Sequence, residues 1–328
     1  MSGKRLQVLI TAPQQAELAE TDFSDADLAG DEIVGRTLVT LISAGTELGG
    51  HYAATTNFPR QPGYTAVFEV ERVGAEVADL KPGDRVFSMA PHASRQRRKR
   101  PEVIPVPGDL PSEKALCARM MCVSMSTLTT TTARPPEPVA VTGLGPVGHF
   151  AAQIFQSCGY EVLAVDPIEA RRRDAQAMGI RNVAERLPRK KEEPLFGTFA
   201  LVLECSGHEP AVVDACKAVR KRGEVVLVGV PWSKRSDLSA FDVLHPVFHK
   251  YAVLRSGWEW ELPNNPSDFR VNSIMGNIAV AMRWLAEGRI KTDGLYELRS
   301  PRDAQQCYQD LLQRRSAKLL TLFDWNKV

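Results

Sequence analysis

A glycine-rich turn between an apolar segment and a helical segment constrains the fold of this chain more than any other feature. Residues 139–142 read Val-Ala-Val-Thr, which is typical of a buried strand, and residues 143–148 read Gly-Leu-Gly-Pro-Val-Gly. A helical pattern follows over 149–158, and a second apolar run over 161–165. This order predicts a strand–turn–helix–strand unit, which implies a parallel sheet with right-handed crossovers.

The same alternation continues toward the C-terminus. Further strands are predicted at 199–204, 224–228 and 252–255, with helices at 168–178 and 210–220. We therefore expect an α/β fold with a doubly wound parallel sheet of the Rossmann type.

The glycine turn and the residue that ends its second strand predict a dinucleotide site. Gly143 permits the tight turn, Gly145 lets the backbone approach a pyrophosphate, and Gly148 lets the helix pack on the strand. The N–H groups where the helix begins, around Pro146 and Val147, are expected to hold the phosphates.

The choice between the two nicotinamide dinucleotides depends on the end of the second strand. Asp166 lies eighteen residues after Gly148, where a carboxylate accepts hydrogen bonds from the ribose hydroxyls and repels a 2′-phosphate. Arg171 begins an arginine run on the next helix and complicates this preference, but the sequence favours NAD(H). Two more loops follow strands and are expected to line the dinucleotide: Ser206 with Gly207, and Gly229 with Val230 and Pro231.

Length and composition limit the class of protein. The 328 residues suit two domains, and 44% hydrophobic residues suit a sizeable core. A net charge of +2 gives no global attraction to nucleic acid or membrane, and no apolar stretch reaches the roughly 18 residues of a membrane span. The six cysteines form no C-x-x-C pair and indicate reduced thiols. We expect a soluble, cytoplasmic protein that acts on a small molecule.

The first 115 residues have a different sequence pattern from the Rossmann segment. Short apolar runs alternate with turn residues there, which predicts a β-rich unit. Two basic runs interrupt the chain, at 95–100 and 189–191. Such runs are mostly solvated surface, but the first could also attract an anionic substrate or a carrier protein.

Three local strings carry a resemblance to a known family. They are Pro82-Gly83-Asp84-Arg85-Val86, the segment 43–48 (Ser-Ala-Gly-Thr-Glu-Leu), and the segment 62–65 (Pro-Gly-Tyr-Thr). With the order of parts, they make the chain resemble the medium-chain dehydrogenase/reductase superfamily, whose best-known branch is zinc alcohol dehydrogenase. The resemblance implies a β-rich GroES-like catalytic domain from residues 1–123 and 258–328, a Rossmann domain from 124–257, and a homodimer.

The positions where that family holds its catalytic zinc have lost their ligands. Ala44 replaces a cysteine, Tyr64 a histidine and Thr65 an acidic residue, while the third ligand position falls near Val123. Cys122 lies next to it, but one cysteine does not hold a zinc ion, since catalytic zinc takes three protein ligands. We therefore expect no zinc. The Gly-Thr-Glu and Pro-Gly-Tyr strings resemble the zinc-free bacteriochlorophyllide dehydrogenase branch.

Without a metal, a hydrogen-bond donor or proton-transfer group must act on the alcohol or carbonyl oxygen. The resemblance implies that Tyr64 points into the catalytic cavity and that Thr46 matches the hydroxyl of the family's proton relay. Glu47 lies beside them, and a structural role is the alternative for it. His51 and His92 could transfer protons or could equally be structural. The resemblance also implies that Thr127 flanks the nicotinamide.

The sequence therefore predicts a zinc-independent, NAD(H)-dependent oxidoreductase that transfers hydride between the nicotinamide and an alcohol or carbonyl of a small or secondary-metabolite substrate. One alternative is a C=N or C=C reductase of a natural-product pathway, and another is a non-catalytic NAD-binding scaffold. Trp258 and Trp260 could form an apolar wall for the substrate, with core packing as the alternative.

Overall fold

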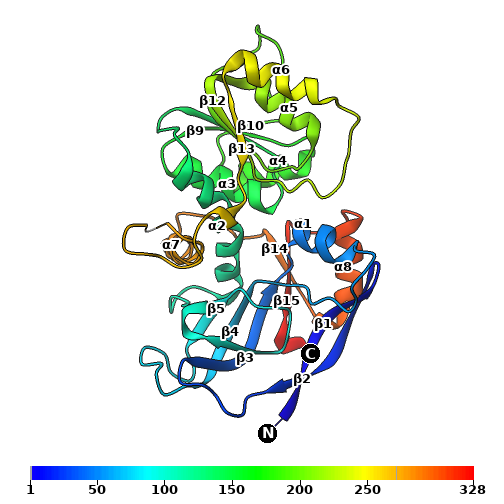
Figure 1. Ribbon diagram of the computed structural model, residues 1–328, viewed down its shortest axis with the longest axis vertical. Helices are drawn as coiled ribbons and strands as arrows, with labels where there is room; N and C mark the ends of the chain where they lie inside the picture. Colours follow the sequence, from blue (N-terminus) through cyan, green and yellow to red (C-terminus); the bar gives the residue numbers. More distant parts are fainter. Residues whose placement is uncertain (1, 271) are drawn as a thin grey trace. The chain divides into compact units, whose positions relative to one another are not determined.

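The computed structural model describes residues 2–270 and 272–328, which divide into two compact units (Figure 1). The first unit contains the chain up to Arg119 and again from Thr292, and the second contains Met120–Lys291. The chain thus returns to the first unit at Thr292, later than the expected residue 258.

Hydrogen bonds explain why residues 258–291 stay with the second unit. The Gln153 side chain bonds both backbone groups of Lys291, accepting from its N–H at 2.8 Å and donating to its carbonyl at 3.0 Å. The Cys122 thiol donates to the carbonyl of Ile274 at 3.5 Å. Ile274 begins a helix, so this helix is held to the second unit at its start and again shortly after its end.

A parallel sheet with strand order β10-β9-β8-β11-β12-β13 forms the centre of the second unit (Figure 1). Its central strands are buried on both faces, so they are continuous apolar runs and were visible in the sequence. The α/β class with a Rossmann sheet is confirmed. The strands are β8 (Pro138–Thr142), β9 (Glu161–Val165), β10 (Asn182–Ala184), β11 (Phe199–Glu204), β12 (Val219–Leu227) and β13 (Val253–Ser256).

Helices connect these strands, and the long α2 (Ser112–Thr130) carries the chain from the first unit into the second. The others are α3 (Pro146–Ser157), α4 (Glu169–Ala177), α5 (Glu209–Ala218), α6 (Ala240–Lys250) and α7 (Ile274–Ala286). The sequence analysis missed α6, which contains Pro246. The Asp242 carboxylate accepts from both the N–H and the hydroxyl of Ser239, and this capping box starts the helix.

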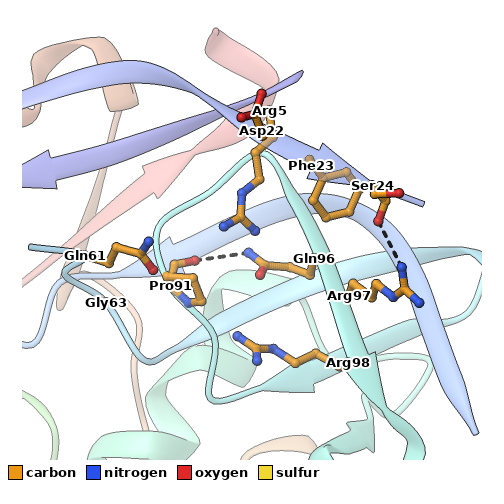
Figure 2. Close-up of a pocket in the computed structure, with 10 residues that line it drawn as sticks. All are labelled: Arg5, Asp22, Phe23, Ser24, Gln61, Gly63, Pro91, Gln96, Arg97 and Arg98. Atoms are coloured by element: carbon orange, nitrogen blue, oxygen red, sulfur yellow. Dashed lines mark hydrogen bonds between the residues drawn. The ribbon is translucent and has the colours of Figure 1, made fainter. Parts of the chain in front are cut away.

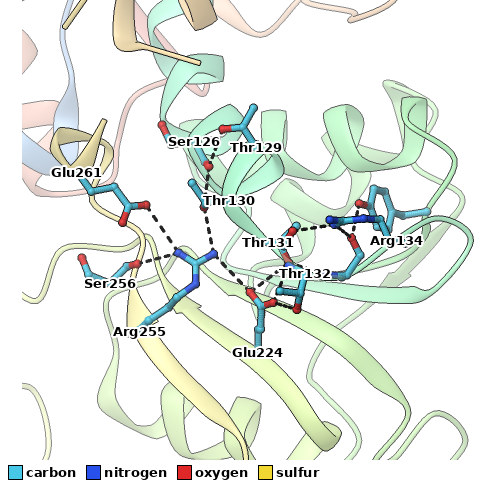
Figure 3. A network of polar contacts seen from close by, with 12 residues as sticks. Ser126, Thr129, Thr130, Thr131, Thr132, Arg134, Glu224, Arg255, Ser256 and Glu261 are labelled. Atoms are coloured by element: carbon cyan, nitrogen blue, oxygen red, sulfur yellow. Dashed lines mark hydrogen bonds and ion pairs between the residues drawn. The ribbon is translucent and has the colours of Figure 1, made fainter. Parts of the chain in front are cut away.

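A buried carboxylate joins the end of α2 to the sheet (Figure 3). Glu224 on β12 accepts from the N–H of Thr132 at 2.7 Å and from the hydroxyl of Thr131 at 3.1 Å. Arg255 on β13 donates to Glu224 at 3.4 Å and to the hydroxyl of Thr130 at 3.1 Å. This network ties the last residue of α2 and the two residues that follow it to β12 and β13.

The first unit is built from antiparallel pairing. A hairpin of β1 (Ser2–Ala12) and β2 (Gln15–Ser24) accompanies a mixed sheet of order β14-β15-β3-β4-β5-β7, and β6 also pairs with β3. The basic run 95–99 is therefore a strand. The strands are β3 (Glu32–Leu41), β4 (Ala66–Val73), β5 (Arg85–Ser88), β6 (Arg95–Lys99), β7 (Val103–Pro105), β14 (Tyr296–Arg299) and β15 (Leu320–Asp324).

Near the C-terminus, one helix packs against the segment that contains α1. α1 (Ala44–Glu47) continues into a π-helical turn over Leu48–Tyr52, and α8 (Ala304–Leu312) packs beside it. The rings of Tyr52 and Tyr308 stack at 5.1 Å between centroids.

None of the helices in the described part of the chain has the length and apolarity needed to cross a membrane.

Candidate active site

The glycine turn after β8 has the backbone geometry that a dinucleotide site requires. Gly143 has a φ of +83°, which favours glycine, and a Cβ on Gly148 would lie 1.8 Å from the Gly143 carbonyl oxygen. A Cβ on Gly145, in contrast, would meet no atom of the described residues within 4 Å. Gly143 and Gly148 are therefore required by the fold, whereas Gly145 leaves open the space in front of the turn.

α3 begins directly behind this turn, with Gly145 as its N-cap and Pro146 as its first residue. The His149 N–H donates to the Gly145 carbonyl at 2.9 Å, so the N–H groups of Val147 and Gly148 precede the first helical hydrogen bond. Amides in this position attract phosphate oxygens, and the positive end of the helix dipole adds to the attraction.

The loops after β11 and β12 converge on the same turn, as the sequence analysis expected. A Cβ on Gly143 would lie 2.9 Å from the Ser206 nitrogen, and a Cβ on Gly229 would lie 2.3 Å from the Gly207 nitrogen. Val230 and Pro231 follow on the exposed side of this edge. The three loops therefore pack backbone to backbone at the carboxyl end of the sheet.

A buried carboxylate that the sequence analysis missed holds the middle loop. Glu204, the last residue of β11, accepts from the N–H groups of Ser206 at 2.8 Å and Gly207 at 3.0 Å. Burial raises the pKa of Glu204, although these hydrogen bonds act to lower it. The signal was an acidic residue at the end of an otherwise apolar strand, Phe-Ala-Leu-Val-Leu-Glu.

Asp166 lies directly after β9 and contacts the glycine turn. One carboxylate oxygen accepts from the Leu144 N–H at 2.7 Å and from Arg171 at 3.3 Å, and the other accepts from the Ile168 N–H at 2.8 Å. A carboxylate has about four acceptor positions, so about one stays open for a ribose hydroxyl. Asp166 is only 1% exposed. A ribose that forms a second hydrogen bond to this carboxylate would therefore have to displace the Arg171 guanidinium.

Two buried polar side chains near this turn lack partners within the described chain. One is the Thr127 hydroxyl on α2, and the other is His149, with both ring nitrogens. Burial lowers the pKa of His149 to about 4, so this imidazole is neutral near pH 7. The neighbouring Ser124 hydroxyl donates to the Val147 carbonyl at 3.1 Å, which holds this part of α2 against the start of α3.

Tyr64, Thr46 and Ser43 form a chain of hydroxyl groups in the first unit. The Tyr64 hydroxyl lies 2.5 Å from the Ser43 hydroxyl and 3.5 Å from the Thr46 hydroxyl. Gly63, with φ at +93°, turns the backbone just before Tyr64, and a Cβ there would meet His92 at 2.7 Å. The structure thus brings together two of the predicted catalytic residues and adds Ser43, which the sequence analysis did not single out.

An arginine packs against this tyrosine. The Arg119 guanidinium carbon lies 4.8 Å from the centroid of the Tyr64 ring, and Arg119 is only 2% exposed. The sequence analysis missed this residue. Its signal was clear, because Arg119 is the single charged residue between Lys114 and Arg134 in a run that is otherwise apolar or small.

Glu47 and His92 lie in a different environment, fully buried with a partner at every polar position. Glu47 accepts from the Ser43 N–H at 2.7 Å, from the Tyr308 hydroxyl at 2.5 Å, and pairs with His92 at 3.0 Å. The second His92 nitrogen lies 2.8 Å from the Thr40 hydroxyl. Burial acts to raise the pKa of Glu47, but the charge and hydrogen bonds of His92, with those of Tyr308 and Ser43, hold it below its usual value.

This geometry favours the structural alternative for both residues. A side chain with no exposed surface does not reach a substrate, so Glu47 and His92 act by positioning α1 and the loop before Tyr64. His51, on the π-helical turn, is half-buried, and its Nδ1 has no hydrogen-bond partner in residues 2–270 and 272–328. Burial lowers the pKa of His51, which favours the neutral imidazole.

The sequence analysis assigned the family's zinc-ligand positions to Ala44, Tyr64 and Thr65 in the first unit and to the neighbourhood of Val123 in the second. Thr65 is fully buried, and the Tyr64 hydroxyl is bonded to Ser43. In the part of the chain that the structure describes, no three His, Cys, Asp or Glu side chains come together in a way that could hold a metal ion.

Comparisons with known proteins find dehydrogenases that are similar to this chain. Residues 146–260 match the family model described as zinc-binding dehydrogenase. An alcohol dehydrogenase from Geobacillus stearothermophilus is 29% identical over 286 residues, a match that covers 74% of this chain and 77% of that protein.

Two solved structures share the fold. Galactitol-1-phosphate dehydrogenase from Escherichia coli has a TM-score of 0.81 at 18% identity, covering 97% of this chain and 99% of that one. A putative zinc-binding dehydrogenase from Sinorhizobium meliloti 1021, solved bound to NADP, has a TM-score of 0.78 at 14% identity, covering 98% and 99%.

Fold, site and comparisons together define the class as an oxidoreductase with a Rossmann domain for a nicotinamide cofactor. More particularly, the chain is similar to alcohol and polyol dehydrogenases, in sequence over part of its length and in fold over nearly all of it.

Proposed function

We propose that this protein is an NAD(H)-dependent oxidoreductase that interconverts an alcohol and a carbonyl without zinc. The observation that carries the proposal is the Tyr64 corner, where a phenol hydroxyl joined to Ser43 and Thr46 lies against the Arg119 guanidinium. In this proposal, groups that donate and accept protons take the place of the relatives' metal. The substrate we propose is a small or secondary-metabolite alcohol or carbonyl compound.

NAD(H) supplies the hydride acceptor or donor when it is bound. The N–H groups of Val147 and Gly148 would hold its phosphates, and Asp166 would accept from a ribose hydroxyl. The Thr127 hydroxyl, which has no partner among the described residues, is available to the polar groups of the nicotinamide. Asp166 also supports NAD(H) over NADP(H), because it would repel a 2′-phosphate.

Tyr64 carries the proton in the proposed mechanism. During oxidation its deprotonated phenolate oxygen accepts the proton of the substrate alcohol and becomes the phenol, and during reduction the phenol donates that proton to the carbonyl oxygen. Ser43 and Thr46 accept and donate hydrogen bonds at the same oxygen, so they keep it oriented in both protonation states. Arg119 lies against the ring and stabilises negative charge on the phenol oxygen, which zinc does for the substrate oxygen in its relatives.

Two alternative functions stay open as proposals. A C=N or C=C reductase would use the same nucleotide site and would also need a proton donor, a role that Tyr64 can fill. A non-catalytic scaffold would need no linked hydroxyls and no buried cation beside Tyr64, so these features favour an enzyme.

We also propose a homodimer formed through the second unit. β13 ends the parallel sheet, and α6 beside it exposes Phe241 (67%), Leu244 (63%) and Phe248 (77%). A free sheet edge flanked by apolar side chains is suited to pairing with a second copy of the chain. Light scattering of the purified protein should give twice the chain mass, and Phe248→Asp should give the mass of one chain.

Turnover with a panel of secondary alcohols and their carbonyl compounds, followed by NADH absorbance, tests the proposed function. Tyr64→Phe should lower kcat by about 10²- to 10⁴-fold while NADH binding stays unchanged. Tyr251→Phe, which removes the hydroxyl of an exposed tyrosine, is the matched control and should retain full activity. Equal turnover by Tyr64→Phe and the wild type would exclude Tyr64 as the proton-transfer group.

A further inference from the structure

A pocket lies in the first unit, and the ten residues that line it do not include Tyr64, Ser43 or Thr46 (Figure 2). Its volume is about 480 Å³, within the range of small-molecule sites. Arg5 of β1 and Phe23 of β2 form one side, Gln96 and Arg98 of β6 form another, and Gly63 lies at its edge. Both arginines and Gln96 point toward the same space in Figure 2.

Arg98 differs from the other arginines of the basic run. Arg95 pairs with Asp25 and Glu71, Arg97 pairs with Glu32, and Arg100 pairs with Asp79. Arg98 has no ion pair and no side-chain hydrogen bond to the residues that the structure describes, and its Nε is buried without a partner. The other arginines of the basic run are therefore held in ion pairs, and Arg98 is the arginine of this run whose charge is not paired with a carboxylate of the described residues.

Arg5 has hydrogen bonds but no acidic partner. Its guanidinium donates to the Gln7 side-chain oxygen at 3.0 Å, to the Arg95 carbonyl at 3.3 Å and to the Thr21 hydroxyl at 3.4 Å. A guanidinium has five N–H donors, so two are left over. Burial lowers the pKa of Arg5, and the positive charge of Arg98 lowers it further, while burial also lowers the pKa of Arg98. Two cations thus face one pocket without a shared counter-ion.

Gln96 adds an acceptor to this pair of cations. Its amide nitrogen, which has two N–H groups, lies within hydrogen-bond distance of the Thr37 hydroxyl at 3.1 Å and of the carbonyls of Pro91 at 3.0 Å and Ala93 at 3.1 Å. These three acceptors fix the amide orientation, so its oxygen is buried and receives no hydrogen bond from the described chain. A ligand hydroxyl would supply the missing donor.

Two carboxylates lie near the pocket. Asp22 lines it but is exposed and bonded to Lys4 at 2.6 Å. Glu102 acts on Arg98 electrostatically, and one of its oxygens accepts from the Lys99 N–H at 3.0 Å. Neither carboxylate forms an ion pair with Arg5 or Arg98, so the excess of positive charge in the pocket persists.

We propose that this pocket binds a small molecule that carries a phosphate or carboxylate group next to a hydroxyl group. Arg98 and the free donors of Arg5 would hold the anionic oxygens, since guanidinium groups match the geometry of phosphate and carboxylate. Gln96 would accept from the hydroxyl. This proposal rests on the residues that line the pocket, so it does not depend on the redox function proposed above.

Isothermal titration of the full chain with sorbitol 6-phosphate, with sorbitol and inorganic phosphate as comparisons, tests this proposal. The titrations are made in about 0.15 M salt, which screens unspecific attraction. They are repeated with saturating NADH, which occupies the phosphate-binding amides of the glycine turn. We expect saturable binding of sorbitol 6-phosphate that persists with NADH, weaker binding of inorganic phosphate, and none of sorbitol.

Arg98→Gln should weaken this binding about tenfold or more, because a charge-assisted hydrogen bond is lost. The matched control is Arg100→Gln, which removes the same charge from the same run but lies outside the pocket, and it should bind as the wild type does. Equal weakening by both variants, or no binding of either phosphate compound, would overturn the proposal.

A stability measurement separates a ligand site from a structural role for Arg98. Because Arg98 has no internal partner, Arg98→Gln should unfold at the same or a higher temperature than the wild type in phosphate-free buffer. A marked fall in Tm would show that Arg98 stabilises the fold, and it would contradict its assignment to a ligand.

Discussion

The nucleotide turn of the second unit and the Tyr64 corner of the first unit are built from different parts of the chain. The turn is formed by the backbone, because its loops pack closely at glycine residues and the groups proposed to bind phosphate are backbone N–H groups. The Tyr64 corner is made of side chains that hold one another, with Ser43 and Thr46 at the hydroxyl and Arg119 at the ring. A backbone site constrains the sequence at fixed spacings, whereas a side-chain site can change its residues and still keep its fold.

On the proposed function, this difference would explain why the dinucleotide fingerprint is kept while the zinc ligands of the relatives are replaced. Replacing Gly148 would break the packing of α3 on β8, so the whole second unit depends on it. Replacing a zinc ligand changes only local chemistry, provided that the new side chains satisfy one another. The following predictions test this contrast, from the largest expected effect to the smallest.

Gly148→Val should abolish NADH binding and strongly destabilise the second unit. Its Cβ would lie 1.8 Å from the Gly143 carbonyl oxygen, where only a backbone shift can relieve the clash. Gly145→Ala is the matched control, because its Cβ meets no atom of the described chain within 4 Å. We expect wild-type thermal unfolding but weaker NADH binding for Gly145→Ala. If both variants unfold at the wild-type temperature, the turn is not fixed by backbone contact.

Glu47→Gln should destabilise the first unit by about 3 kcal/mol, because His92 and Tyr308 lose a buried carboxylate partner. Urea unfolding measures this, with Glu69→Gln on the exposed pair with Arg36 as the control of small effect. Since the Arg119–Tyr64 contact does not involve Glu47, loss of activity in proportion to loss of folded protein would agree with a positioning role.

The same variant should change the acid dependence of stability. The folded-state pKa of Glu47 lies below its usual value, so its carboxylate contributes full stability above the ordinary glutamate pKa of about 4.3. That contribution is lost as the pH falls through the depressed folded value. Unfolding free energies measured from pH 6 downward should therefore fall less steeply in Glu47→Gln than in the wild type, and identical slopes would contradict this account.

Arg119→Met should lower kcat about tenfold or more, while NADH affinity stays within about twofold, because the cation beside Tyr64 is removed. Arg119→Lys keeps the charge and should recover part of the loss. The pH profile of kcat separates an electrostatic effect from a packing effect. Loss of the charge in Arg119→Met should shift the alkaline limb of the profile, whereas a loss of packing alone should lower kcat at every pH and leave that limb in place.

Arg171→Ala should have the smallest effect, a few-fold gain in NADH affinity measured by fluorescence titration. Arg171 takes an acceptor position on Asp166 that a ribose hydroxyl would otherwise use. If NADPH affinity falls instead and NADH affinity is unchanged, Arg171 binds a 2′-phosphate and the proposed cofactor preference is wrong.

Much of the second unit could be predicted from sequence because its central strands are buried on both faces and appear as plain apolar runs. α6 was missed because Pro246 interrupts a pattern whose apolar side chains face outward and not toward a core. The expected boundary near residue 258 differs from the point at which the chain leaves the second compact unit, since tertiary contacts such as that between Gln153 and Lys291 hold α7 to that unit.

The candidate site divides in the same way. The glycine spacing and Asp166 gave the nucleotide site, since each follows from local backbone geometry. Arg119 lies 55 residues from Tyr64 in the chain, and no local pattern joins them. Glu47 and His92 fitted a catalytic pattern by residue type, and their complete burial in the structure favours the structural alternative.

Whether Tyr64 and its neighbours replace the metal is tested most directly by the zinc content of the active enzyme. The protein is dialysed against a chelator, its zinc is measured by elemental analysis, and NAD(H)-linked turnover is followed in the same sample. This account predicts negligible zinc per chain and unchanged turnover. One zinc per chain, with activity that is lost on chelation and restored by added zinc, would contradict it.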